Sequence, residues 1–254
     1  MSANIHSTAI VMPGAQIDKS VTIGPFCIIG EAAQIAKGSE VGAYCEIGLQ
    51  TGVLPPGPVT IGPNSIIRSG SCIYQNSVFG NGLKTGHRVT LREGILAGDG
   101  LQVGTLSDIQ GHCEIGKHVR LHSNVHIGQR SKVGDFVWIF PYVVLTNDPH
   151  PPSQTMDGCS IQEFAVVATM STVLPGRIVG RGALVGAMTL VREDVPDDTI
   201  CVGNPGRNVG STTKIRFSDT GKPVYPWRRH FHRGYPEEIV AKWRAEFPRE
   251  GGEL

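Results

Sequence analysis

Aromatic side chains are scarce in this chain: Phe, Tyr and Trp make up 6% of its 254 residues, and charged residues make up only 18%. Rings normally supply much of the bulk of a globular core, so a core with so few of them must be thin and aliphatic. With 40% hydrophobic residues, the chain is nevertheless too apolar for a disordered protein. The shortage of rings therefore argues against an ordinary two-layer domain.

Long hydrophobic runs are also missing, so the sequence offers no candidate for a membrane span. Residues 1–10 have neither the basic start nor the apolar stretch of a secretory signal, and we expect a cytoplasmic protein. A formal net charge of +1 argues against nucleic acid as a partner. The six cysteines are spaced too widely for a metal cluster, so we expect reduced thiols and no metal.

Glycine, in contrast, is abundant, with 33 residues, and many of them recur at a fixed interval. An aliphatic residue returns at every sixth position in three blocks, 5–53, 61–145 and 161–191. Of these 30 positions, 27 hold Ile, Val or Leu, and the next residue is Gly at 14 of them. The position four residues after the aliphatic one is mostly small, and four cysteines occupy such positions: Cys27, Cys45, Cys113 and Cys159.

This spacing resembles the hexapeptide repeat of left-handed parallel β-helix proteins. In that family three repeats form one triangular coil, so the resemblance implies an all-β solenoid of about ten coils over residues 1–208. The left-handed winding is implied by the resemblance alone, because parallel crossovers are otherwise right-handed almost without exception. A narrow prism has room for stacked Ile and Val but little for rings, which accounts for the shortage of aromatics.

Two interruptions of the repeat predict loops, since a solenoid expels extra residues from its coils. Residues 54–60 (LPPGPVT) predict a small corner loop. Residues 146–160 (TNDPHPPSQTMDGCS) are polar, rich in proline and too long for a corner, so we interpret them as a loop that carries part of a functional site. Residues 200–208 close the helix.

A tail without the repeat follows at residues 209–254. Its first part, 211–233, interleaves basic and aromatic residues, and its second part, 236–247, predicts one amphipathic α-helix that begins at a proline. Two interpretations stay open. The tail covers the prism by packing against it or against a neighbouring subunit, or its basic stretch receives a diphosphate or an acidic partner.

Several segments of the prism resemble those of acyltransferases on this fold. The segments 86–93 (GHRVTLRE), 121–124 (LHSN) and 146–152 (TNDPHPP) resemble sugar acyltransferases, chiefly enzymes that N-acetylate nucleotide-linked amino sugars. Within 166–206, the strings ATMSTVLPG, ALVGAMTLVREDVP and VGNPG resemble acetyl-CoA-binding coils. The resemblance implies acetyl-CoA or another acyl-CoA as co-substrate, a nucleotide-sugar acceptor, and a homotrimer with active sites between subunits.

Residue by residue, the resemblance gives His87 the role of general base and Glu93 that of its orienting partner. Histidine changes its protonation state near neutral pH, so it can take the acceptor's proton there. Each of the two lies two positions after a position of the aliphatic column, and both are expected to point outward. The same segment contributes Arg92 as a substrate-binding residue.

The long loop is expected to contact the acceptor or the thioester through Asn147, Asp148 and His150, while a neighbouring subunit supplies His87. Five residues are expected to bind the cofactor, by backbone contacts to pantetheine from Ala168 and Ser171 and by contacts to the phosphates of CoA from Arg181, Arg192 and Arg207. Arg177 departs from the repeat because it occupies a small interior position, so either the corner opens there or the side chain points outward.

Three other interpretations compete with this one. The segments 5–11 and 23–30 also resemble the UDP-N-acetylglucosamine O-acyltransferases that use acyl carrier protein, although that family's histidine motif is not matched around His122 and His126. A zinc-dependent γ-type carbonic anhydrase would need converging ligands, but His118, His122 and His126 fall at different points of the repeat and should diverge. The third is a scaffold without catalysis whose basic tail binds an acidic partner.

Overall fold

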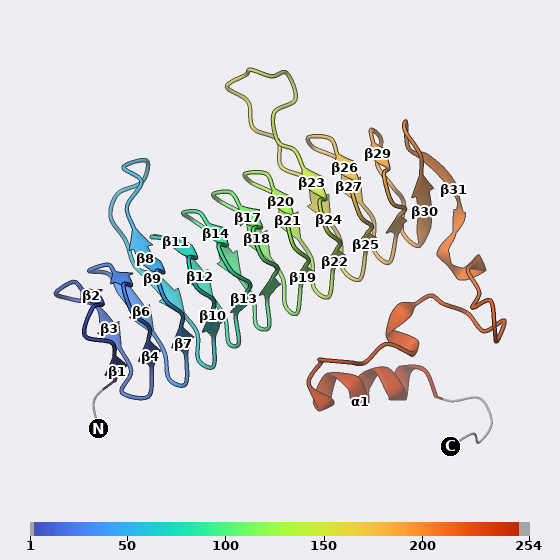
Figure 1. The fold of residues 1–254 in the computed structure, drawn as a ribbon. Coiled ribbons are helices and arrows are strands. Elements are labelled where there is room, and N and C mark those ends of the chain that lie inside the picture. The colour runs from blue at the N-terminus through green and yellow to red at the C-terminus, as the bar shows by residue number, and fades with distance from the viewer. Residues whose placement is uncertain (1–2, 249–254) are drawn as a thin grey trace.

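The computed structural model describes residues 3–248 and shows a prism of short parallel strands wound in coils (Figure 1). Each coil contributes a strand to each of three sheets, which we call A, B and C, and neighbours in a sheet come from successive coils. The fold is the left-handed β-helix that the resemblance implied, with about eleven turns and a single α-helix in the tail.

Sheet A consists, in spatial order, of β1 (Asn4–Ile5), β4 (Thr22–Ile23), β7 (Glu40–Val41), β10 (Ile66–Ile67), β13 (Lys84–Thr85), β16 (Gln102–Val103), β19 (Arg120–Leu121), β22 (Trp138–Ile139), β25 (Val166–Val167), β28 (Leu184–Val185), β30 (Thr199–Val202) and β31 (Arg207–Ser211). Sheet B consists of β2 (Ile10–Val11), β5 (Ile28–Ile29), β8 (Glu46–Leu49), β11 (Cys72–Tyr74), β14 (Thr90–Leu91), β17 (Asp108–Ile109), β20 (His126–Ile127), β23 (Val144–Leu145), β26 (Thr172–Val173) and β29 (Leu190–Val191). Sheet C consists of β3 (Gln16–Ile17), β6 (Ala33–Ile35), β9 (Val59–Ile61), β12 (Val78–Phe79), β15 (Leu96–Ala97), β18 (Glu114–Ile115), β21 (Lys132–Val133), β24 (Ser160–Ile161) and β27 (Ile178–Val179).

We name the three edges of the prism by the sheets that they join. In one coil, the AB edge is residues 86–89, between β13 and β14, the BC edge is 92–95, between β14 and β15, and the CA edge is 98–101, between β15 and β16. The corners of other coils stack on these because the strands pair in register, as Leu91 of β14 does with Ile109 of β17. The edge on which a residue lies therefore determines which other residues it can reach.

The inward side chains of the coils form one continuous aliphatic core. Ile5, in the first coil, is 39% exposed because no coil lies beneath it. Burial raises the pKa of the Cys113 thiol to about 11 and that of Cys159 to about 12, so both thiols stay protonated at neutral pH. Five of the six cysteines are buried and unbonded: Cys27, Cys45, Cys113, Cys159 and Cys201.

The first interruption of the repeat begins earlier than the sequence predicted. Val53 was expected to point inward, but it is 65% exposed. The chain leaves the prism after β8 ends at Leu49 and returns where β9 begins at Val59, whose side chain is fully buried. The loop is therefore 50–58 rather than 54–60, because Val59 and Ile61 of β9 take the inward positions instead.

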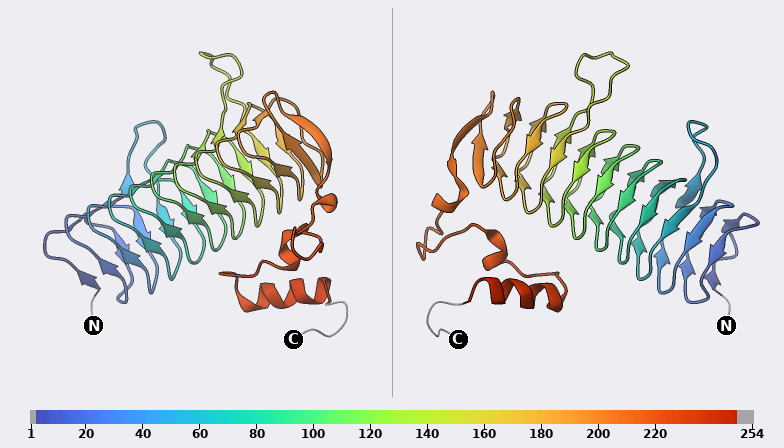
Figure 2. Two further views of the ribbon diagram at one scale, coloured as in Figure 1. Left: turned by 45° about the vertical axis from the view of Figure 1, so that its right-hand side comes forward. Right: turned by 180° about the vertical axis from the view of Figure 1, so that it is seen from behind.

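The second interruption lies where the sequence placed it. The chain leaves the prism after β23 and returns at β24, so residues 146–159 form a loop that stands away from the coils (Figure 1). Both this loop and loop 50–58 connect sheet B to sheet C, and both project on the same side of the prism (Figure 2). The BC edge thus carries both insertions.

The tail begins inside the solenoid rather than after it. β31 pairs antiparallel with β30 and so covers the last edge strand of sheet A. It also crosses the boundary expected between residues 208 and 209. Two 3-10 helices, η1 (Thr212–Lys214) and η2 (Trp227–Arg229), lead to α1 (Glu237–Glu246), close to the predicted helix 236–247. No helix of the described residues has the length and apolar character needed to cross a membrane.

The rest of the tail packs against a side of the prism, on the outer face of sheet A and the CA edge, and lies opposite the two loops (Figure 2). The Nε1 of Trp227 donates a hydrogen bond to the Phe164 carbonyl at 3.0 Å, and the Nε1 of Trp138 donates to the Tyr235 hydroxyl at 2.8 Å. A second core joins the two parts, with the buried residues Phe164, Val166, Trp227, Tyr235, Val240 and Trp243. The tail thus does pack against the prism: β31 covers the end of sheet A, and the remainder packs on a side.

Candidate functional site

His87 lies on the AB edge and is exposed, as the sequence predicted. It lines an open cavity of about 420 Å³. Its backbone N–H donates to the Thr105 hydroxyl at 3.2 Å, which fixes the corner but leaves the ring free. None of the residues that line this cavity is acidic: Tyr44, Ser69, Gly70, His87, Arg88, Thr105 and Leu106. The structure gives His87 solvent access without a carboxylate to orient its ring.

Glu93 lies on a different edge and is only 4% exposed, so the expectation that it points outward is wrong. Its carboxylate accepts two hydrogen bonds from Arg92, at 2.9 Å from Nε and 3.2 Å from Nη2. It is tucked beneath the next corner, where a Cβ on Gly111 would come within 3.2 Å of Oε1. Burial raises the pKa of Glu93, but the bonds from Arg92 outweigh this and leave the pKa below its ordinary value. Glu93 thus pairs with Arg92 rather than with His87.

Asp148 organises the long loop. Its Oδ1 accepts hydrogen bonds from the His150 N–H at 3.0 Å and the Ser153 hydroxyl at 2.7 Å, and its Oδ2 accepts from the Ser153 N–H at 3.0 Å. These bonds, chiefly the one from the Ser153 hydroxyl, lower the pKa of Asp148. His150 is left exposed at the surface of the loop. The carboxylate therefore holds the turn in place and leaves the imidazole accessible to a ligand.

The neck of the loop is tied closely to the coils around it. The Asn147 carbonyl accepts a hydrogen bond from the Asp157 N–H at 2.7 Å, which closes the neck. A Cβ on Gly158 would lie 2.2 Å from the Arg130 carbonyl, so only glycine fits there. On Gly128 a Cβ would lie 3.2 Å from the Asn147 Cβ, so Asn147 is packed against the end of β20. The neck of the loop is thereby packed against the BC corner that follows β20.

A polar cluster that the sequence analysis missed lies on the outer face of sheet B. The Nδ1 of His126, on β20, is 3.1 Å from Oδ1 and 3.0 Å from Oδ2 of Asp108, on β17. Gln110 Nε2 donates to Asp108 Oδ2 at 2.5 Å. Burial raises the pKa of Asp108, but the hydrogen bonds from His126 and Gln110 bring it below its ordinary value. The repeat could have revealed this pair, because both residues occupy the outward position of strands one coil apart.

The three histidines of one coil have unlike surroundings. His118, on the CA edge, stacks on Phe136 with ring centroids 5.4 Å apart. His122, on the AB edge, stacks on Phe140 at 4.6 Å. His126 pairs with Asp108 on sheet B. Among residues 3–248 no three side chains of His, Cys, Asp or Glu are grouped closely enough to hold a metal ion. The three rings therefore lie on different parts of the prism.

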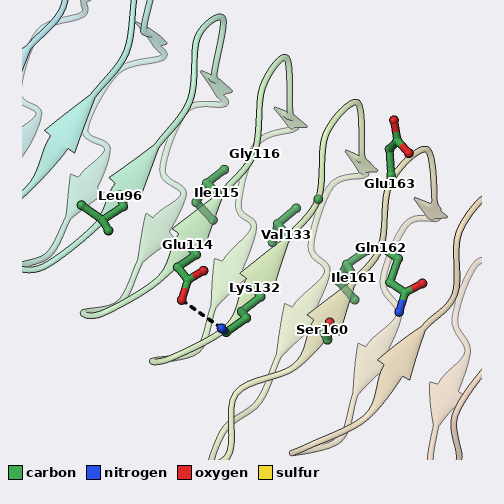
Figure 3. A pocket seen from close by; sticks show the side chains of 11 residues that line it. Leu96, Glu114, Ile115, Gly116, Lys132, Val133, Ser160, Ile161, Gln162 and Glu163 are labelled. Atoms are coloured by element: carbon green, nitrogen blue, oxygen red, sulfur yellow. Dashed lines mark ion pairs between the residues drawn. The ribbon is translucent and has the colours of Figure 1, made fainter.

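A further cavity, of about 540 Å³, lies on the outer face of sheet C across successive strands (Figure 3). Leu96 borders it, and within it Glu114 Oε1 and Lys132 Nζ form an ion pair at 2.9 Å, both of them well exposed. None of the residues expected to form the site lines this cavity. It begins at Ser160, where the long loop ends, and lies on sheet C, whereas His126 lies on sheet B.

No family model matches the chain. Among curated proteins, the chain is 35% identical over 122 residues to a serine acetyltransferase of Bacillus subtilis, which covers 48% of this chain and 50% of the relative. It is 35% identical over 63 residues to a dTDP-3-amino-3,6-dideoxy-alpha-D-galactopyranose 3-N-acetyltransferase of Aneurinibacillus thermoaerophilus, which covers 23% of this chain and 33% of the relative. The chain thus spans half or less of the length of these relatives.

Among solved structures, a UDP-N-acetylglucosamine acyltransferase of Arabidopsis has a TM-score of 0.70 at 18% identity, over 98% of this chain and 85% of that one. At this identity the likeness shows the fold alone. The repeat, the solenoid and the curated acetyltransferases agree with one another. The chain has the hexapeptide repeat and the left-handed β-helix, and in sequence it is similar to acetyltransferases over about half of its length.

Residues that bind one cofactor should lie close together, but the three expected arginines lie on different parts of the prism. Arg181 is on the CA edge, where its Nε is 3.1 Å from the Glu163 carboxylate. Arg192 follows β29 on the BC edge, and Arg207 begins β31 at the end of sheet A. Within a single chain these three side chains do not form one phosphate site.

The two residues expected to contact pantetheine also differ. Ala168 lies on the AB edge, as His87 does, and is partly exposed. Ser171 is fully buried: its hydroxyl donates to the Gly186 carbonyl at 2.8 Å, and its carbonyl accepts from the Val144 N–H at 3.0 Å. The Ser171 carbonyl, one of the backbone groups expected to serve the cofactor, and the Ser171 hydroxyl are therefore both used to hold the coils together.

Arg177 resolves its conflict with the repeat by pointing outward. Its side chain is 38% exposed, and its Nη1 lies 3.6 Å from Asp194 Oδ1 on the next corner. Its Nε donates to the Pro175 carbonyl at 3.4 Å. The corner therefore keeps its hexapeptide shape without a buried charge.

Proposed function

We propose that this protein transfers an acyl group from acetyl-CoA or another acyl-CoA to the amino group of a nucleotide-linked amino sugar. The observation that supports this most is the long loop: it has the sequence TNDPHPP, it is ordered by Asp148, and its neck packs against the corner that follows β20, the strand of His126. The similarity to an amino-sugar N-acetyltransferase over 63 residues is consistent with such an acceptor.

The chemistry is direct attack without a covalent enzyme intermediate. The acceptor nitrogen forms a bond to the thioester carbonyl carbon, the carbon–sulfur bond breaks, and the sulfur leaves as the CoA thiol after gaining a proton. The nitrogen must lose a proton, so the enzyme needs a base and a donor for the developing oxyanion. The sequence proposes His87 as that base, and its exposure leaves the ring accessible.

We propose further that the enzyme works as a homotrimer with sites between subunits. His87 is on the AB edge, whereas the loop with Asn147, Asp148 and His150 is on the BC edge, as is Arg92. The coils are pinned in register by parallel pairing, so one chain cannot bring two of its own edges together. An active site that uses both sets therefore requires the AB edge of one subunit to lie against the BC edge of another.

Release of free thiol tests the proposal. The protein is incubated with acyl-CoAs of increasing chain length and with a panel of nucleotide-linked amino sugars, with the corresponding hydroxyl sugars as a matched control. We expect thiol release with an amino sugar, and an amide product by mass spectrometry. Release only when UDP-N-acetylglucosamine is offered with an acyl carrier protein donor would instead support O-acylation. Absence of transfer in every combination would support the scaffold.

A further inference from the structure

This inference rests on the proposed function and concerns the group that takes the acceptor's proton. His126 lies on β20 and Asp108 lies on β17, and the two residues are direct partners in the parallel ladder. Their outward side chains are therefore held in contact by the backbone and need no loop to bring them together. The Nδ1 of His126 lies within 3.1 Å of both oxygens of Asp108.

This arrangement selects one form of the imidazole. A carboxylate can only accept, so the neutral ring must carry its proton on Nδ1, and the lone pair is then on Nε2. Gln110 Nε2 donates to Asp108 Oδ2 at 2.5 Å and so helps to hold the carboxylate in place. Nε2 makes no hydrogen bond to any of residues 3–248, and the side chain is 38% exposed. The ring is oriented, accessible and basic at the nitrogen away from Asp108.

The neighbouring elements leave this pair undisturbed. β23, on the other side of β20, contributes the apolar Val144, and β14, below Asp108, contributes Thr90. Arg92 and Glu93, on the BC edge after β14, are paired with each other. Among the described residues, His126 is the one histidine in an ion pair with a carboxylate. His87, in contrast, lines a cavity without an acid.

We propose that His126 is the general base of the transfer, with Asp108 and Gln110 as positioning residues. Nε2 accepts the proton that leaves the acceptor nitrogen as the carbon–nitrogen bond forms. The imidazolium then returns the proton to the departing CoA sulfur, so the ring ends each turnover neutral. Asp108 stabilises the imidazolium between the two steps and keeps the ring in the productive tautomer.

Kinetics of His126→Ala test this role. We expect kcat to fall on the order of 10²-fold or more while KM changes little, because a base acts in the transition state. Added imidazole should restore part of the lost kcat. Asp108→Asn should lower kcat on the order of 10²-fold as well, because the Asn amide can donate to Nδ1 and so favour the wrong tautomer. The matched control is His112→Ala, an exposed histidine on the BC edge.

A second measurement is independent of turnover. Nitrogen NMR of protein labelled in histidine should show His126 protonated on Nδ1 in the wild type and redistributed in Asp108→Asn. The role of His126 as general base would be overturned by a His126→Ala enzyme with kcat within about threefold of wild type. A neutral His126 protonated on Nε2 would overturn it as well. A wild-type protein that transfers nothing to any acceptor would instead refute the proposed function, and this role with it.

Discussion

The AB and BC edges of the prism are built from the same repeat but differ in what they present. On the AB edge every corner is short, and large side chains stand outward in a column, beginning with Phe26 stacked on Tyr44 at 5.0 Å. Further exposed residues of that column are Leu106, Tyr142, Met170 and Met188. The BC edge carries both insertions and the Arg92–Glu93 pair, and the pair of His126 and Asp108 lies on the adjoining outer face of sheet B.

The difference shows where a solenoid can accept new chemistry. A corner of fixed length offers only the outward side chains that the repeat leaves free, as the AB edge does with His87. A corner that is allowed to lengthen adds backbone turns and polar groups without disturbing the ladders on either side. We therefore expect substitutions on the BC side to change catalysis more than substitutions on the AB edge.

The largest effect is expected from Asp148→Ala in the long loop. This change removes three hydrogen bonds that hold the turn, so the loop residues lose their positions and kcat/KM should fall on the order of 10²-fold. The melting temperature should change little, since the loop lies outside the core. Steady-state kinetics and thermal unfolding check the two statements, with Ser153→Ala as a milder variant. Undiminished kcat/KM would show that the loop is not part of the site.

Acidification should reproduce part of this effect. The pKa of Asp148 is lowered by its hydrogen bonds, so the ordering of the loop is fully present above the ordinary value of about 3.9. It is lost as the pH falls through the lowered pKa. Protease cleavage within 146–159 should therefore remain slow near pH 5 in the wild type and become faster only as the pH falls through the lowered pKa. In Asp148→Ala it should be faster at any pH.

A smaller effect is expected from His87→Ala on the AB edge. The cavity of His87 has no carboxylate to orient the ring, so we expect His87 to bind the acceptor rather than act as the base. Its loss should then raise KM about tenfold and leave kcat nearly unchanged. Steady-state kinetics of the folded His87→Ala variant measure both constants. A fall in kcat as large as that of His126→Ala would break the comparison and restore His87 as the base.

Mixing provides the control for the two edges. When His87→Ala and Asp148→Ala chains are dissociated and reassembled together at equal amounts, about a quarter of the sites between subunits should have both edges intact. Activity at low substrate should then exceed that of either variant alone. Activity no higher than the average of the two would place both residues in the same subunit's site.

The smallest effect is expected from Arg92→Met, which leaves the Glu93 carboxylate buried without its donors. The free energy of unfolding at pH 7 should fall by about 1–3 kcal/mol. The loss should shrink below about pH 4, because the Glu93 pKa is lowered in the wild type and its stabilisation is lost as the pH falls through that value. Denaturant unfolding measures this. Lys132→Met, which breaks the exposed pair on sheet C, should change stability by less than about 0.5 kcal/mol.

How far the sequence could predict the structure depended on whether a feature repeats. The six-residue period predicted the coils, the inward cysteines and the exit of the long loop, and the proline with two acids predicted the helix at Glu237. The prediction that Val53 points inward was wrong, because the six-residue period does not show at which residue the chain leaves the prism and at which it returns. The prediction that Glu93 points outward was wrong, because its burial depends on contacts outside the repeat. Arg92 pairs with its carboxylate, and Gly111, one coil later, leaves space for it.

The order of residues by itself determined the prism, since in-register stacking follows whenever the same small and aliphatic positions recur. Only the tertiary structure decided which side chains meet. Trp138 and Phe164 interrupt the polar outer surface, but only the fold shows that Tyr235 and Trp227 cover them on a side of sheet A. Asp108 and His126 are 18 residues apart and become neighbours because one coil rests on the next. The physical reason is that a local period fixes backbone geometry, whereas side-chain pairs depend on contacts between coils.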